Sequence, residues 1–175
     1  MLQRKGQEFR AIVTHLEMCT PPNITPFWPH PNLVLQETAQ PDIHLYRQIY
    51  DQIGRPYHWV NRRYISDYML KQILHHPQNH VHYLYEDDEI IGFTEVNARR
   101  FPEIELVFVG LKESAIGKGY GKALLHHTLD FIWSHAPQRV IIQTNTLDNP
   151  AALHLYQKSG FTPFDREEVT IIDRG

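Results

Sequence analysis

The sequence of 175 residues contains a single cysteine, Cys19. One thiol cannot form a disulfide within the chain, and it leaves no cysteine pair for a zinc site. We therefore expect a reducing compartment, the cytoplasm, with Cys19 a packed residue at the end of a strand. Long hydrophobic runs are also missing. The longest apolar stretches, such as LVFVGL at 106–111, fall far short of the roughly 20 residues that a membrane span needs, so we expect no membrane association.

A strong excess of charge is missing as well. The formal net charge is −3 and the isoelectric point is about 6.4, which gives no basic surface for nucleic acid. A small-molecule partner fits this balance better, and a homodimer is left open. With 42% hydrophobic residues the chain is long enough for one well-buried domain, 1–175, and it has no internal repeat.

Periodicity predicts a mixed α+β order, with strand pairs early and a β–loop–α–β–α–β arrangement late. A proline-rich connector at 21–32 follows the first strand, and Asp87-Asp88 marks a hairpin. The predicted strands are 9–18, 33–39, 81–86, 89–96, 103–109, 139–145 and 167–173. The predicted helices are 43–53, the segment from the cap Ser66 to before Pro77, the segment after the glycines of 117–121, and 149–160.

Three glycines alternate in the stretch IGKGYGKALLHHTLDFIW, which begins at Ile116. It matches neither a dinucleotide fingerprint, because Lys122 stands where the third glycine belongs, nor a P-loop. What remains is a row of unhindered backbone N–H groups at the start of a helix, where an anion such as phosphate is favoured. Lys118 and Lys122 would add positive charge, or they are ordinary solvated lysines.

A second motif, NPAALHLYQKSGF, covers 149–161. By local physics alone, Asn149 is an N-cap, the proline after it takes the first helical position, and Gly160 ends the helix. Tyr156 lies on the apolar face of that helix, where packing is the usual outcome.

Together the two motifs resemble those of the GNAT superfamily of N-acetyltransferases, and the resemblance covers about 81–173. The matching residues are Gly119, Gly121, Asn149, Ala152, Tyr156, Gly160 and Phe161. Ile116 departs from the pattern, since the family usually has Gln or Arg there. The resemblance implies an α+β fold with a central mixed, mostly antiparallel sheet. That sheet would be flanked by helices and splayed between the strands at about 103–111 and 139–146.

The resemblance also implies acetyl-CoA as cosubstrate. The N–H groups of the glycine loop would hold its pyrophosphate, the main chain of the preceding strand would pair with its pantetheine arm, and Gly110 suits a bulge that splays this strand. The implied cofactor-binding residues are Val109, Leu111, Gly117, Lys118, Gly119, Tyr120, Gly121, Lys122 and Asn149.

For catalysis, the resemblance implies that Glu105 deprotonates an amine and that Tyr156 protonates the leaving thiolate. Glu103 shares the face of Glu105 and is an alternative base, and a solvent-facing carboxylate on an alternating strand is the structural alternative. The implied reaction moves acetyl from acetyl-CoA to a primary amine of a small molecule or peptide by direct attack in a ternary complex. A non-catalytic acyl-CoA-binding sensor is the alternative function.

Two further groups of residues stay open. Tyr57, His58 and Trp59 fall where this family lines its acceptor cleft, and an aromatic cluster could hold a cation or a ring there, or simply pack. The histidines at 75, 76, 80 and 82 invite a metal hypothesis, but Pro77 breaks the helix that would align them. We therefore expect no metal.

Overall fold

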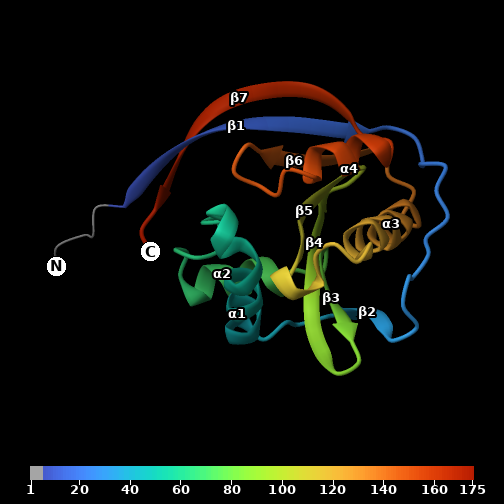
Figure 1. Ribbon diagram of the computed structural model, residues 1–175, viewed down its shortest axis with the longest axis horizontal. Coiled ribbons are helices and arrows are strands. Elements are labelled where there is room, and N and C mark those ends of the chain that lie inside the picture. The colour runs from blue at the N-terminus through green and yellow to red at the C-terminus, as the bar shows by residue number, and fades with distance from the viewer. Residues whose placement is uncertain (1–5) are drawn as a thin grey trace.

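A seven-stranded sheet runs through the computed structural model, which describes residues 6–175 (Figure 1). The strands lie in the order β2-β3-β4-β5-β6-β1-β7. Their bounds are β1 Gln7–Met18, β2 Leu33–Thr38, β3 Asn79–Glu86, β4 Glu89–Arg100, β5 Glu103–Leu111, β6 Arg139–Asn145 and β7 Thr162–Asp173. Strands β5 and β6 pair in parallel and the other pairings in residues 6–175 are antiparallel, which confirms the predicted mixed sheet.

Helices cover both faces of the sheet (Figure 1). They are α1 Ile43–Gly54, α2 Asp67–Leu74, α3 Tyr120–Trp133 and α4 Ala152–Lys158, with short 3₁₀ turns η1 Arg55–Tyr57 and η2 Glu113–Ala115. One core cluster packs α1 and α2 on the sheet, and another packs α3 and Tyr156 of α4 on the opposite face. The splayed strands therefore have a helical layer on each side.

Local signals placed most helix ends correctly. The Ser66 side chain accepts a hydrogen bond from the Met69 N–H at 3.2 Å, as its predicted capping role requires. Gly160 follows α4 with φ of +112°, the conformation expected after a helix. The predicted cap at Asn149 is wrong, because α4 begins at Ala152; the Asn149 side chain accepts from the Ala151 N–H at 3.0 Å and forms a turn ahead of the helix.

Strand β1 lies between β6 and β7, an arrangement that the sequence pattern does not reveal. Val13 of β1 pairs with Asn145 of β6, and the full length of β1 runs antiparallel to β7. Figure 1 shows β1 and β7 as a long curved ribbon across one end of the molecule. Strand β7 is also longer than the predicted 167–173, because it pairs with β1 from Thr162 onward.

The two strands that were predicted to splay, β5 and β6, separate after a short paired stretch and leave a slot between them. Strands β5 and β6 pair over three residues, ending with Glu105 opposite Ile141, and then diverge. The predicted splay between these strands is therefore present.

The bulge in β5 is not at Gly110, so that prediction is wrong. Opposite β4, the pairing skips Val107, whereas Gly110 stays in register with Phe93. Gly110 is needed for space: a Cβ there would lie 2.6 Å from Ile53 Cγ2. The glycine thus admits α1 against the strand, and the bulge three residues earlier shifts the side-chain alternation of β5.

Candidate functional site

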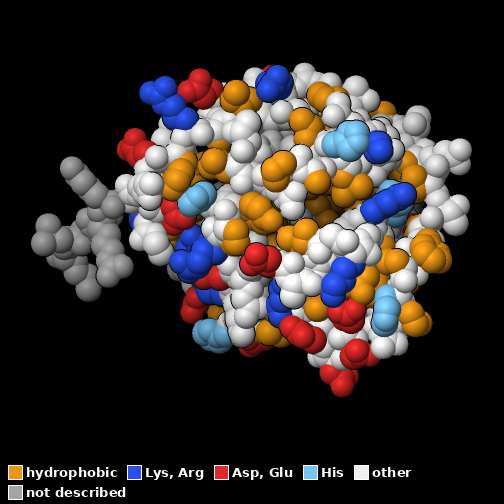
Figure 2. Space-filling view, in the orientation of Figure 1, with side chains coloured by type: hydrophobic (Ala, Val, Ile, Leu, Met, Phe, Trp, Pro, Cys, Tyr) orange, Lys and Arg blue, Asp and Glu red, His pale blue; other side chains and the backbone are white. Residues whose placement is uncertain are grey.

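A cavity of about 460 Å³ opens where β5 and β6 diverge. Figure 2 shows hydrophobic side chains gathered around a hollow on this face. The walls come from β5 (106–111), β6 (142–145), the glycine turn (Gly117, Gly119), the start of α3 (Gly121, Lys122), α4 (Tyr156), residues 57–61 after α1, and Val13 and Ile171 of the β1–β7 ribbon. Its volume is within the usual range of about 300–1,000 Å³ for small-molecule sites.

The glycine turn presents bare backbone to this cavity. Gly117 and Gly119 have φ of +83° and +79°, and a Cβ on either would meet nothing within 4 Å. The N–H of Ala123 bonds to the Gly119 carbonyl at 3.3 Å, so the amides of Tyr120 to Lys122 come before the first helical bond. Three free donors at the positive end of a 14-residue helix form a cradle for an anion.

Two predicted cofactor residues, Lys118 and Tyr120, are not among the residues that line the cavity. The Tyr120 side chain is buried, and its hydroxyl donates to Glu86 Oε1 at 2.6 Å. The Lys118 ammonium lies 5.6 Å from the centre of the Tyr120 ring. Lys122, in contrast, lines the cavity, so it is the lysine placed to add charge. The other predicted cofactor residues, Val109, Leu111 and Asn149, line the cavity as well.

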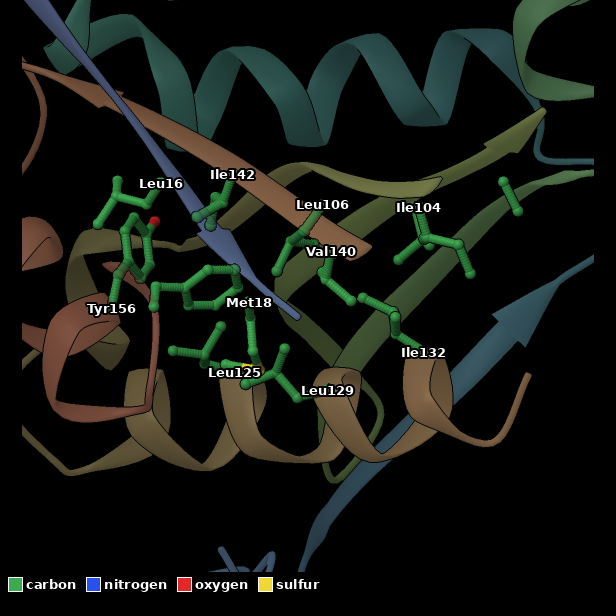
Figure 3. Close-up of a cluster of buried hydrophobic side chains, with 13 residues drawn as sticks. Leu16, Met18, Ile104, Leu106, Leu125, Leu129, Ile132, Val140, Ile142 and Tyr156 are labelled. Atoms are coloured by element: carbon green, nitrogen blue, oxygen red, sulfur yellow. The ribbon is translucent and has the colours of Figure 1, made fainter. Parts of the chain in front are cut away.

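Tyr156 points from α4 into the core cluster beside Leu16 and Ile142 (Figure 3). Its ring also forms part of the cavity wall. Burial raises the pKa of Tyr156 well above its usual range, and the charge of Asp148 acts in the same direction. The phenol is therefore neutral at physiological pH and can donate a hydrogen bond into the cavity.

The predicted base, Glu105, is half-buried beside the cavity, whose wall on β5 begins at Leu106. Burial raises the pKa of Glu105, and Arg100 and Arg62 oppose that rise. Glu105 itself is not among the residues that line the cavity. Glu103, the alternative base, has its Oε2 in an ion pair with Arg139 Nη1 at 2.8 Å, which ties it to β6.

Three aromatic side chains form another part of the cavity wall, which we call the aromatic wall. Tyr57, Trp59 and Phe108 line it, with 5.2 Å between the ring centres of Trp59 and Phe108. The indole fits closely over Gly54, where a Cβ would lie 2.5 Å from Trp59 Cε3. The Trp59 Nε1 donates to Asp148 Oδ1 at 3.0 Å, so this wall is fastened to the loop after β6. Asp148 was missed by sequence reasoning, since it belongs to neither motif.

A buried charged network supports the aromatic wall from behind. Glu95 on β4 is fully buried, and its Oε1 accepts from Arg62 Nη2 at 2.8 Å and from Asn79 Nδ2 at 3.4 Å. Its other oxygen accepts from the Tyr46 hydroxyl. The Arg62 guanidinium in turn lies 5.3 Å from the centre of the Phe108 ring. Ion pairing deep in the fold thus fixes one face of the cavity.

The histidines of the metal hypothesis make separate contacts. His75 Nε2 bonds to the Pro41 carbonyl at 3.0 Å, and His80 Nδ1 to Glu37 Oε1 at 2.6 Å. Burial lowers the pKa of His82 to about 4. In residues 6–175, no group of three or more His, Cys, Asp or Glu side chains could hold a metal ion. None of the helices in this range is long and apolar enough to cross a membrane.

Residues 44–161, which are more than half of the chain, match the model of the acetyltransferase (GNAT) family. A mycothiol acetyltransferase of Corynebacterium efficiens is 34% identical over 87 residues, which are 50% of this chain and 29% of that protein. The match therefore spans less than a third of this curated relative.

Two solved structures show the same fold. A GCN5-related N-acetyltransferase from Sphaerobacter thermophilus superposes with a TM-score of 0.63 at 18% identity, over 95% of this chain and 53% of that one. A GNAT family acetyltransferase from Elizabethkingia anophelis with acetyl-CoA bound gives 0.59 at 20% identity, over 78% and 80%. With its splayed mixed sheet, its glycine turn and this family match, the chain belongs to the GNAT family of acetyltransferases.

Proposed function

We propose that this chain is an acetyl-CoA-dependent N-acetyltransferase that acts on a primary amine of a small molecule or peptide. The observation that carries the proposal is that one cavity joins three features: the bare glycine turn, the slot between β5 and β6, and the Tyr156 ring. A phosphate-bearing acyl donor and an acceptor can therefore share this space.

The residues of the slot fit acetyl-CoA. A pyrophosphate would accept from the amides of Gly119 to Lys122, in the open space that a Cβ at Gly119 would enter, with Lys122 adding charge. The main chain at Val109 and Leu111, beyond the pairing of β5 with β6, would hold the amide-bearing arm. When bound, acetyl-CoA supplies the activated thioester, and the protein orients the reactants and moves protons.

Two side chains are proposed for proton transfer. Glu105 accepts, through water, the proton that the amine nitrogen loses as it attacks; its raised pKa brings it closer to the range in which a base works efficiently. The neutral Tyr156 hydroxyl donates a hydrogen bond to the departing sulfur. The main-chain N–H near Val109 or Leu111 polarises the thioester carbonyl.

The acceptor site is proposed to lie against the aromatic wall. The rings of Tyr57, Trp59 and Phe108 give a surface that attracts a cation or an apolar amine substituent. The relative from Corynebacterium efficiens is a mycothiol acetyltransferase, which supports a small-molecule acceptor. A reducing, cytoplasmic setting remains the proposal made from the single thiol.

The proposal is tested by binding and by turnover. Micromolar acetyl-CoA or CoA should raise the melting temperature, because a ligand that binds only the native state stabilises it, whereas NAD and ATP should not. Thiol release is then measured with acetyl-CoA and a panel of amines: 2-phenylethylamine, spermidine, glucosamine and a lysine-containing tetrapeptide.

A melting shift with ATP and none with CoA would contradict the proposed cofactor. A CoA shift without thiol release from any amine would instead favour the acyl-CoA-binding sensor.

A further inference from the structure

One histidine on the cavity wall is held in an unusual way. His58 follows η1 in the left-handed conformation, with φ of +56° and ψ of +39°. Such a conformation is uncommon for a residue other than glycine, and it is found preferentially at functional sites. The imidazole stacks on Phe9 of β1, with 3.8 Å between the ring centres. Two distant segments of the chain thus meet at this residue.

Asp173 of β7 fixes the orientation of the ring. His58 Nδ1 lies 2.9 Å from Asp173 Oδ2, and the other carboxylate oxygen accepts from Arg63 Nη1 at 3.0 Å and from the Tyr64 hydroxyl at 2.8 Å. Burial alone would raise the pKa of Asp173, but hydrogen bonds from His58, Tyr64 and the Gly175 N–H and the charge of Arg63 hold it well below its usual range. The carboxylate is therefore ionised and can only accept hydrogen bonds.

This contact settles the tautomer of the imidazole. Because Asp173 offers no proton, the hydrogen between the two residues belongs to His58 Nδ1. In the neutral ring, Nε2 then carries the lone pair, and it is the nitrogen left for a ligand in the cavity that His58 lines. A carboxylate that orients a histidine in this way is a common arrangement for a general base.

The chemistry needs a second proton acceptor. An alkyl amine has a pKa of about 10.4 and arrives as an ammonium ion, which cannot attack. Transfer of acetyl from a thioester to that nitrogen forms one C–N bond, breaks one C–S bond and removes two protons from nitrogen. One proton ends on the thiolate sulfur and the other in solvent. Glu105 accounts for the proton lost on attack, which leaves the first proton of the ammonium without an acceptor.

We propose that His58 is a further catalytic residue, whose Nε2 takes the first proton from the acceptor ammonium, and that Asp173 is its positioning residue. The inference rests on the proposed function. The imidazole is partly exposed, with 29% of its side chain accessible, so it can return the proton to solvent before the next cycle.

The charged surroundings of the ring are compatible with this role. They include Asp173 on β7, Arg63 and Tyr64 on the loop after η1, and Asp51 on α1, whose Oδ1 bonds to Arg63 Nε at 3.0 Å. The guanidinium of Arg174 lies 5.6 Å from the centre of the Tyr64 ring. Arg63 is shared between Asp173 and Asp51, and Asp51 also pairs with Arg55 Nη2 at 3.0 Å, so two carboxylates face two guanidinium groups. Asp173 stays ionised beside His58 Nδ1, with its charge partly balanced by Arg63.

The test compares His58→Asn with the unmodified chain, using acetyl-CoA and the fastest amine of the panel. Asparagine tolerates the left-handed conformation and its amide can donate to Asp173, but it cannot accept a proton. We expect kcat/KM to fall by about 10²-fold at pH 7, and the deficit to shrink as the pH nears the pKa of the amine, when the nucleophile arrives already deprotonated. The melting shift with acetyl-CoA should be unchanged.

Two further variants complete the test. Asp173→Asn should lower kcat/KM and change its dependence on pH, because an amide can donate to His58 as well as accept from it and so no longer fixes the proton on Nδ1. His15→Asn is the matched control: His15 Nε2 on β1 bonds to Glu167 Oε1 on β7 at 2.9 Å, outside the cavity, and its loss should leave kcat/KM unchanged.

Wild-type kcat/KM in His58→Asn would overturn the assignment, as would a deficit that is equal at every pH. If His58→Asn does not fold, an unmoved pH profile in Asp173→Asn overturns it. Failure of the proposed function is distinguishable, because the unmodified chain would then release no thiol with any amine, and the inference would fall with it.

Discussion

Replacing Arg62 by methionine should destabilise the protein strongly, because it leaves the carboxylate of Glu95 buried without its cation. The Glu95 side chain is 0% exposed and that of Arg62 is 14% exposed, so water cannot take the place of the lost partner. Breaking a buried ion pair in this way costs about 3–5 kcal/mol. For a chain of this size 1 kcal/mol lowers Tm by about 2–4 °C, so we expect a decrease of about 6–20 °C.

The assay is urea unfolding together with calorimetry. The double variant Arg62→Met/Glu95→Met should recover most of the loss, because it removes the unpaired charge. Arg10→Met is the control: Arg10 forms a surface pair with Glu168 at 3.9 Å, and its removal should change stability by less than about 1 kcal/mol. Equal destabilisation in the single and double variants would refute the reasoning.

Three further outcomes concern the active site. Gly121→Asp should abolish the melting shift with CoA, because its charge repels a phosphate, although an acidic residue otherwise suits the first turn of a helix. Gly121→Asn, which is uncharged and of equal size, should keep more affinity for CoA. Equal binding of CoA by both variants would exclude a phosphate at this turn. Glu105→Gln should lower kcat by about 10²–10⁴-fold near neutral pH. In the unmodified chain, kcat should fall as acid protonates Glu105, and because the pKa of Glu105 is raised, this fall should come at a higher pH than for an exposed glutamate. An unchanged kcat in Glu105→Gln would make the carboxylate a passive strand residue. Tyr156→Phe should lower kcat about tenfold, which is the contribution of one hydrogen bond. The loss should be the same at every pH assayed, because a phenol whose pKa is raised stays protonated and remains a donor. Full activity in Tyr156→Phe would mean that Tyr156 only packs.

Features set by neighbouring residues could be predicted from the sequence. The Ser66 cap, the break after α4 at Gly160 and the glycine turn each depend on the conformational limits of a few adjacent residues. The bulge could not be placed in this way, because its position at Val107 follows from the register of β5 against β4. Gly110 suggested a backbone irregularity, whereas the structure uses it to make room for α1.

The same distinction holds for the site. The motifs located the turn residues and Tyr156, which belong to contiguous segments of the chain. Asp148 and the pair of His58 and Asp173 became visible only in three dimensions, because His58 and Asp173 are 115 positions apart and meet through the placement of β1 and β7. No periodicity or spacing rule connects residues at that separation, since strand order is decided by the packing of the whole sheet.

The position of β1 has a consequence for how the chain acquires its structure. This strand is made before the other strands of the sheet, yet its partners β6 and β7 begin at Arg139 and Thr162, so its backbone stays unpaired until those strands have been made. Contacts of such long sequence separation slow folding, and an unpaired apolar strand is open to association with other chains in the meantime. The parts of the cavity wall on α4 and β7, which include Tyr156 and Ile171, are made last, and a nascent chain should gain affinity for acetyl-CoA only once β7 has emerged.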